Sequence, residues 1–246
     1  MKKVQFVMCL VFCLSNVKVM AQTQAMIGCL KYQFEGNNAY VIDYDESTIP
    51  ENLVIPETIE HNNLTYKVTK ICKEAIRSEK IRSLIVNPRL SVIEERAFSH
   101  CLNLEKIDVC ADSIGRQAFS QINLKEAIIH GKILGLGCFY LCPMLETVIL
   151  DGVEDIELGA FKSCYNLKWI DFGNSLNRIG SSAFENCSSL TYLVFPASLY
   201  RICPTQGKDY YYRPYNDWGY KSPYSKNDSR NNGLYRWEST LSAFKD

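Results

Sequence analysis

Apolar residues recur along the middle of the chain in a pattern that repeats from one segment to the next. An Ala-Phe pair, or Cys-Phe in one copy, occurs five times, and successive phenylalanines are 21, 20, 22 and 23 residues apart. An aliphatic residue stands five positions before each phenylalanine, and a leucine follows it. The phenylalanines are Phe98, Phe119, Phe139, Phe161 and Phe184, the aliphatic residues are Ile93, Ile114, Leu134, Ile156 and Ile179, and the leucines are Leu104, Leu124, Leu145, Leu167 and Leu190. A sixth, degenerate copy precedes these at Ile71, Ile76, Ile81 and Leu84.

Each copy ends in a run that alternates between apolar and polar residues. Leu104–Val109 and Leu190–Phe195 are examples, and a period of two is typical of a β-strand. The stretch before each run, such as Ile93–Phe98, places apolar residues at helical spacing for little more than one turn. A strand plus a short helix, repeating about every 20 to 29 residues, is typical of a leucine-rich-repeat solenoid. The pattern therefore predicts an α/β fold with a parallel β-sheet on one face and short helical turns on the other.

Stacking of the copies is an energetic requirement. Burial of each Ile, Leu, Phe or Val side chain contributes roughly 1.5 to 3 kcal/mol, whereas ordering each residue's backbone costs roughly 1 to 2 kcal/mol. A single copy exposes apolar side chains that only neighbouring copies can cover. Isolated copies are therefore expected not to fold.

The combination of an aliphatic anchor, Ala-Phe, Cys, Asn-Leu and a strand resembles the bacterial leucine-rich repeats of the BspA type. Ile156–Phe172 and Ile179–Pro196 match that pattern closely, and Leu53–Glu57 with Tyr66–Thr69 resembles the opening segment of such repeats. The resemblance covers about residues 32 to 202. It implies a secreted or surface-displayed bacterial protein with a role in adhesion, and it carries no catalytic residues.

The first residues are typical of a secretory signal. Lys2 and Lys3 precede an apolar run from Val4 to Ser15 and a small-residue site at Val19–Ala21, so the mature chain is expected to begin at Gln22. The apolar run is too short for a membrane span, which needs about 20 residues. We therefore expect a secreted or envelope-associated protein after signal removal.

The predicted organisation has four parts. A signal peptide covers residues 1–21, a β-rich N-terminal cap 22–70, a solenoid of about six repeats 71–203, and a Tyr- and Asn-rich C-terminal segment 204–246. The cap is inferred from alternating runs at Asn38–Tyr44 and Leu64–Val68, with a turn at Asn62-Asn63. The last segment is open to three interpretations, a cap, a ligand surface or a partly disordered tail. The run Ile27-Gly28-Cys29 only weakly resembles a lipid-attachment site, and Met26 argues against one.

The charge balance and the placement of cysteines and histidines argue against nucleic-acid binding, zinc binding and catalysis. Lys plus Arg and Asp plus Glu are both 27, so no basic run is available to follow a nucleic-acid backbone. Four cysteines, each three residues after a repeat phenylalanine, are expected to form a buried ladder of free thiols. No paired CxxC motif supports zinc, and His61, His100 and His130 lie in no recognisable catalytic signature. We expect no enzyme activity, metal or cofactor. The ladder cysteines are Cys101, Cys142, Cys164 and Cys187.

The outward side of the strands carries the candidate binding site. With Ile107 and Val109 inward, the alternation turns two rows of side chains outward, and these rows bring aromatic and aliphatic residues together on adjacent coils. The predicted site consists of Trp169, Tyr192, Ile149, Asp171 and Val194. Alternatively, Ile and Val simply favour strands and shield one another.

Two functions follow from these features. The first is an exported binding protein that recognises an extracellular or cell-surface protein, or a glycan, through its strand face. The second is a structural spacer in the cell envelope. In that case the C-terminal segment or a partner chain covers the apolar side chains on the outward side of the strands. Neither nucleic acid nor a membrane span belongs to either hypothesis.

Overall fold

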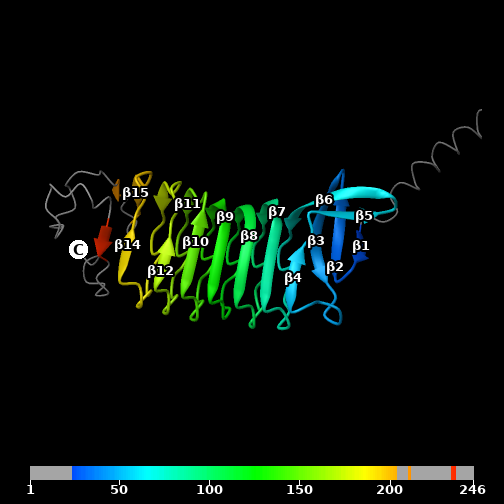
Figure 1. Cartoon of the computed structure of the whole chain (residues 1–246), viewed down its shortest axis with the longest axis horizontal. Helices are drawn as coiled ribbons and strands as arrows, with labels where there is room; N and C mark the ends of the chain where they lie inside the picture. The colour runs from blue at the N-terminus through cyan, green and yellow to red at the C-terminus, as the bar shows by residue number, and fades with distance from the viewer. Residues whose placement is uncertain (1–23, 204–209, 212–233, 237–246) are drawn as a thin grey trace, which may run out of the picture.

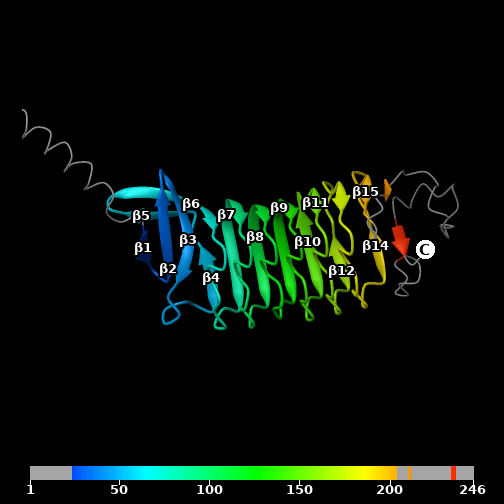
Figure 2. The ribbon, with the colours of Figure 1, turned by 180° about the vertical axis from the view of Figure 1, so that it is seen from behind.

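The computed structural model describes residues 24–203, 210–211 and 234–236. Within these residues the chain is a β-solenoid whose coils follow one another along the long axis of the molecule (Figures 1 and 2). The predicted signal peptide and most of the C-terminal segment lie outside the described residues. The strands are β1 (Gln24–Ile27), β2 (Leu30–Glu35), β3 (Asn38–Tyr44), β4 (Asn52–Ile55), β5 (Thr58–His61), β6 (Leu64–Ile71), β7 (Ser83–Ile93), β8 (Lys106–Ile114), β9 (Glu126–Leu134), β10 (Thr147–Asp151), β11 (Asp155–Ile156), β12 (Trp169–Asp171), β13 (Arg178–Ile179), β14 (Tyr192–Val194), β15 (Arg201–Ile202), β16 (Tyr210–Tyr211) and β17 (Leu234–Arg236).

The N-terminal strands combine antiparallel and parallel pairing. β1, β2 and β3 form an antiparallel meander, and β5 and β6 form a hairpin. Asn62 and Asn63, at the tip of this hairpin, have φ values of 52° and 60°, as expected for a two-residue turn of the type that asparagine favours. β3 then pairs in parallel with β6, and both β4 and β6 pair in parallel with β7. The parallel pairing thus already includes β3, β4 and β6, which precede the first long strand of the solenoid.

The parallel sheet runs through the solenoid on two sides of each coil. In β7, β8 and β9 one long strand spans both sides, whereas later coils use two short strands, β10 and β11, β12 and β13, or β14 and β15. Within β9, Gly131 lies so close to β8 that a Cβ there would be 2.2 Å from the carbonyl oxygen of Ala111. Only glycine permits so close an approach of two coils.

The predicted helical turns are absent, because the described residues contain no helix. In each coil the residues two before and two after the repeat phenylalanine have positive φ, as Arg96 (55°) and His100 (70°) do around Phe98. A left-handed residue interrupts a right-handed helix. The Phe98 N–H donates to the Ala118 carbonyl of the next coil at 2.9 Å, so the backbone bonds that a helix would keep to itself connect neighbouring coils. The α/β assignment is therefore wrong, and the parallel-sheet solenoid is confirmed.

The core contains a column of the five repeat phenylalanines, which runs from Phe98 to Phe184. Phe98, Phe119, Phe139 and Phe161 are fully buried, and Phe184 is 4% exposed. Neighbouring rings lie nearly parallel, with centroids 5.0 to 5.7 Å apart. The aliphatic anchors and repeat leucines pack around this column. Each coil therefore buries its apolar side chains against the coils before and after it, as the energetic argument requires.

The predicted cysteine ladder lies beside the phenylalanine column. Cys101, Cys142, Cys164 and Cys187 are buried free thiols. The thiol of Cys142 donates to the carbonyl of Phe119 in the preceding coil at 3.1 Å, and Cys164 and Cys187 make the equivalent bonds. Burial raises the pKa of the Cys101 and Cys187 thiols to about 12. All four ladder thiols donate hydrogen bonds to backbone carbonyls of the preceding coil, so their role is structural.

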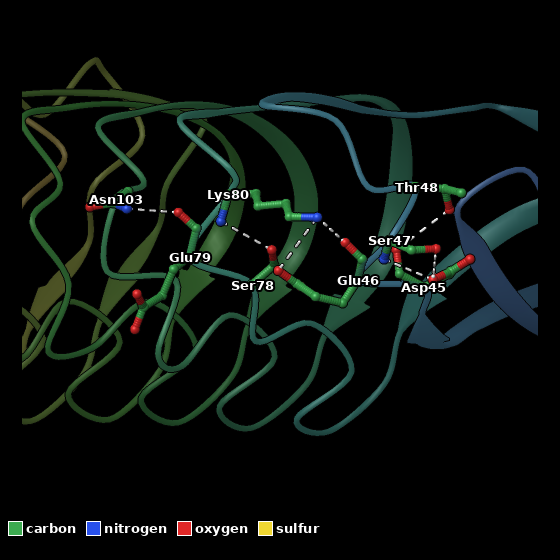
Figure 3. Close-up of polar contacts among 8 residues, drawn as sticks. All are labelled: Asp45, Glu46, Ser47, Thr48, Ser78, Glu79, Lys80 and Asn103. Atoms are coloured by element: carbon green, nitrogen blue, oxygen red, sulfur yellow. Dashed lines mark hydrogen bonds and ion pairs between the residues drawn. The ribbon is translucent and has the colours of Figure 1, made fainter.

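Figure 3 shows polar contacts within the turn after β3, between this turn and the first coil, and between the first two coils. The Lys80 ammonium donates to the carbonyl of Glu46, and the Asn103 amide donates to the carbonyl of Glu79 at 2.8 Å. The Asp45 carboxylate accepts bonds from both the backbone N–H and the hydroxyl of Ser47, which closes the turn after β3. Asn103 thus satisfies a backbone carbonyl of the preceding coil.

Candidate functional site

The outward side chains of the parallel ladder form continuous rows, because each strand pairs in register with the next. Ile107 and Val109 are 3% and 0% exposed, so the prediction that they point inward is confirmed, and Asp108 between them points outward. The first outward row contains Ser83, Lys106, Glu126, Thr147 and Trp169, and the second contains Ile85, Asp108, Ile128, Ile149 and Asp171.

The five residues of the predicted site lie on β10, β12 and β14. Ile149, Trp169 and Val194 are 37%, 40% and 44% exposed, and Asp171 is also exposed. Ile149 and Asp171 are directly paired across the β10–β12 ladder, so these strands bring Ile149, Trp169 and Asp171 onto one surface. Tyr192 is the first residue of β14, and its side chain lies outside the described part of the structure.

A hollow of about 480 Å³ lies between β12 and β14 on this face. Among the described strands, β12 pairs with β10 and β14 pairs with β17, whereas on the other side of the coil β13 pairs directly with β15. Strand pairing is therefore interrupted between β12 and β14 on the candidate face, while β13 and β15 still join the two coils on the other side. The lining residues are Trp169, Ile170, Asp171, Gly173 and Asn174 from one coil and Val194, Phe195, Pro196 and Ala197 from the next.

Turns that follow the two strands build the walls of this hollow. Gly173 has a φ of +60°, and a Cβ there would lie 2.6 Å from the Leu150 carbonyl oxygen, so this turn requires glycine. The Gly173 N–H donates to Oδ1 of Asp171 at 2.9 Å, which orients the carboxylate. On the opposite wall, Pro196 has no backbone N–H and cannot extend the pairing of β14.

The sequence interpretation placed three of the lining residues in the site, namely Trp169, Asp171 and Val194. It missed the turn residues, of which Gly173 and Pro196 shape the walls. The available signal was local, since Gly-Asn and Pro-Ala directly after short strands mark turns. That these two turns lie on adjacent coils and border one hollow follows only from the stacking.

Most charged side chains on the strand face are paired within the chain. The Lys106 ammonium lies 2.9 Å from the Glu126 carboxylate. His130 lies between two carboxylates, with Nδ1 2.9 Å from Asp151 and Nε2 3.5 Å from Asp108. Asp171 differs, because no cation of residues 24–203 forms an ion pair with it.

The strand face also carries a cysteine beside a histidine. Cys110 pairs with His130 across the β8–β9 ladder. Nucleophilic catalysis requires a ring nitrogen directed at the thiol, yet both nitrogens of His130 are directed at carboxylates. This arrangement therefore does not activate Cys110.

The described residues hold neither a metal-binding cluster nor a membrane-spanning helix. No group of three or more His, Cys, Asp or Glu side chains is placed to hold a metal ion. No helix in the same residues is long and apolar enough to cross a membrane.

The sequence profile of the BspA type leucine-rich repeat region matches six copies over residues 47–148 and 132–206. This match covers more than half of the chain and agrees with the coils described above. The chain therefore belongs to the BspA-type leucine-rich repeat family. None of the curated proteins compared with it matches.

Several solved structures of bacterial leucine-rich repeat proteins are similar to this chain. The T. pallidum leucine-rich repeat protein is 19% identical over 68% of this chain and 90% of its own, with a TM-score of 0.51. A Bacteroides ovatus leucine-rich repeat protein is 20% identical over 73% of this chain and 61% of its own, with a TM-score of 0.39. A leucine-rich cell surface protein of Faecalibacterium prausnitzii is 18% identical over 76% of this chain and 73% of its own, with a TM-score of 0.40. At these identities the T. pallidum structure supports the fold alone, and the chain spans less than two thirds of the Bacteroides ovatus protein.

Proposed function

We propose that this chain is an exported binding protein that captures a protein on a cell surface or in the extracellular matrix through its strand face. The observation that carries the proposal is the hollow between β12 and β14, which Trp169, Asp171 and Val194 line together. The secretory signal predicted for residues 1–21 supports an extracellular location, and membership of the repeat family supports a binding role.

The chemistry of the hollow suits recognition of a protein. Anchor residues at interfaces are enriched in Trp and Tyr, and they lie in pockets from which binding excludes water. Trp169 and Val194 supply exposed apolar surface, while Asp171 supplies a polar group that fixes orientation. Because the strands are held by a continuous ladder behind the hollow, little conformational entropy is lost when a partner binds.

A capture experiment tests this proposal. Immobilised full-length protein is incubated with host matrix and bacterial envelope extracts, and bound proteins are identified by mass spectrometry. Replacing Trp169 and Tyr192 by Ala should abolish capture of the partner, while the circular-dichroism spectrum and melting temperature remain nearly unchanged. Tyr165→Ala is the matched control, because Tyr165 is an exposed aromatic residue outside the hollow.

The alternatives give different results. Undiminished capture by the double variant contradicts the strand-face site, and a chain ending at Cys203 then tests the C-terminal segment. Absence of any specific partner for the wild-type chain favours the structural spacer.

A further inference from the structure

The pairing of acidic groups on the strand face singles out Asp171. The carboxylates of Asp108 and Asp151 face His130, and that of Glu126 faces Lys106. Asp171 is exposed on the same face, but residues 24–203 provide no cation for it, and none of the residues that line the hollow is Lys, Arg or His. Within residues 24–203, the negative charge of Asp171 in the hollow therefore has no cation beside it.

Asp171 lines the hollow together with apolar side chains. Its Oδ1 accepts the Gly173 N–H, and a carboxylate has further lone pairs that remain available to another donor. Trp169 is two residues earlier in β12, so its indole and the Asp171 carboxylate project from the same side of the strand. Val194 lies on the opposite wall.

We propose that the hollow receives a basic side chain, arginine above all, from an extended segment of the partner protein. This inference rests on the proposed function and names the partner's anchor. A guanidinium is planar and stacks on the face of an indole, while its N–H groups donate to a carboxylate. The methylene groups of the same side chain contact the apolar wall at Val194.

A purely apolar anchor fits the hollow less well. It would cover the Asp171 carboxylate and remove its water without supplying a donor, and an unpaired charge is costly to bury. A basic side chain neutralises the Asp171 carboxylate and also stacks on the indole of Trp169. The strand face thus favours an arginine-bearing segment over an aliphatic one.

A displayed library of random dodecapeptides tests the proposal. Cells are sorted for binding to the full-length wild-type chain and counter-sorted against a Trp169→Ala/Val194→Ala variant. The enriched peptides should share an arginine, or less often a lysine. In a synthetic enriched peptide, replacing the arginine by citrulline, which is nearly isosteric but neutral, should weaken binding at least tenfold.

Two variants test whether the preference for arginine over citrulline depends on Asp171. Asp171→Asn should weaken binding of the arginine peptide by a similar factor, and the citrulline exchange should then cost little more. Asp151→Asn is the matched control, since it removes an exposed carboxylate from the same face but outside the hollow, and it should leave the affinity within twofold of the wild type.

The outcomes separate the two proposals. Peptides that depend on Trp169 but lack a basic residue, or that bind equally well as citrulline peptides, overturn the basic anchor and leave the strand-face site intact. A library that yields no binder dependent on Trp169 and Val194 overturns both.

Discussion

Phe161 and Phe184 lie face to face in adjacent coils, with ring centroids 5.4 Å apart and an angle of 3° between the ring planes. The same relationship joins Phe139 to Phe161 at 5.2 Å. Each ring therefore covers one face of the ring before it and one face of the ring after it. The stability of one coil depends on its neighbours, as expected for a solenoid.

Loss of a central ring should destabilise the whole solenoid. Phe161→Ala removes the contacts on both faces of a fully buried ring and should lower the free energy of unfolding by roughly 3 to 5 kcal/mol. Phe184→Ala is expected to fall in the same range. Reversible urea unfolding measures both, with the exposed Tyr165→Ala as control. A loss below about 1 kcal/mol would show that these rings are outside the core.

The ladder thiols should be unreactive in the native protein. Cys101, Cys142, Cys164 and Cys187 are buried, and a thiol must reach solvent as thiolate to react. Titration with an aromatic disulfide reagent should leave these four unmodified until urea unfolds the chain, and no reductant should be needed to release them. Peptide mapping that finds Cys142 linked to Cys164, or Cys164 to Cys187, would disprove this.

Stability should fall at alkaline pH because of two of the ladder thiols, Cys101 and Cys187. An unfolded thiol titrates near about pH 8.5, whereas the folded-state pKa of Cys101 and Cys187 is about 12. Above about pH 8.5 the folded chain keeps protons that the unfolded chain releases, so the free energy of unfolding decreases as the pH rises toward 12. The slope is about 1.4 kcal/mol per pH unit for each such thiol.

Urea unfolding between about pH 7 and 10 measures this slope. The Cys101→Ala variant is less stable at every pH, but its stability should decline less steeply than that of the wild type. Equal slopes for the two proteins would mean that the thiol of Cys101 does not contribute.

Gly173 should be irreplaceable in the wall of the hollow. Alanine at a φ of +60° costs roughly 1 to 2 kcal/mol, and here its Cβ would also lie 2.6 Å from the Leu150 carbonyl oxygen. Gly36→Ala is the control, because Gly36 has a φ of +58° and nothing within 4 Å of an added Cβ. Gly173→Ala should therefore lower the melting temperature more than Gly36→Ala and should also weaken partner capture. Equal effects on melting temperature would contradict the close approach.

The repeat pattern predicted the parts of the fold that depend on burial alone. Phe161 and Cys164 are buried because the alternation and spacing of apolar residues set which side chains face inward. The pattern failed at Ile93–Phe98, where apolar spacing indicated a helical turn. That failure has a definite cause, since Arg96 and His100 have positive φ and neighbouring coils accept the N–H groups that a helix would use internally.

The sequence by itself determined the repeat period, the inward and outward positions of each strand, and thus the exposure of Trp169 and Asp171. Only the tertiary structure decided that strand pairing stops between β12 and β14 and leaves a hollow there, in which Asp171 forms no ion pair with any of residues 24–203. Pairing between coils depends on which backbone groups meet in space, and residues some twenty positions apart meet there because the coils stack. The local pattern therefore indicates whether a residue is buried or exposed, whereas the stacking of the coils determines which residues of the next coil it contacts.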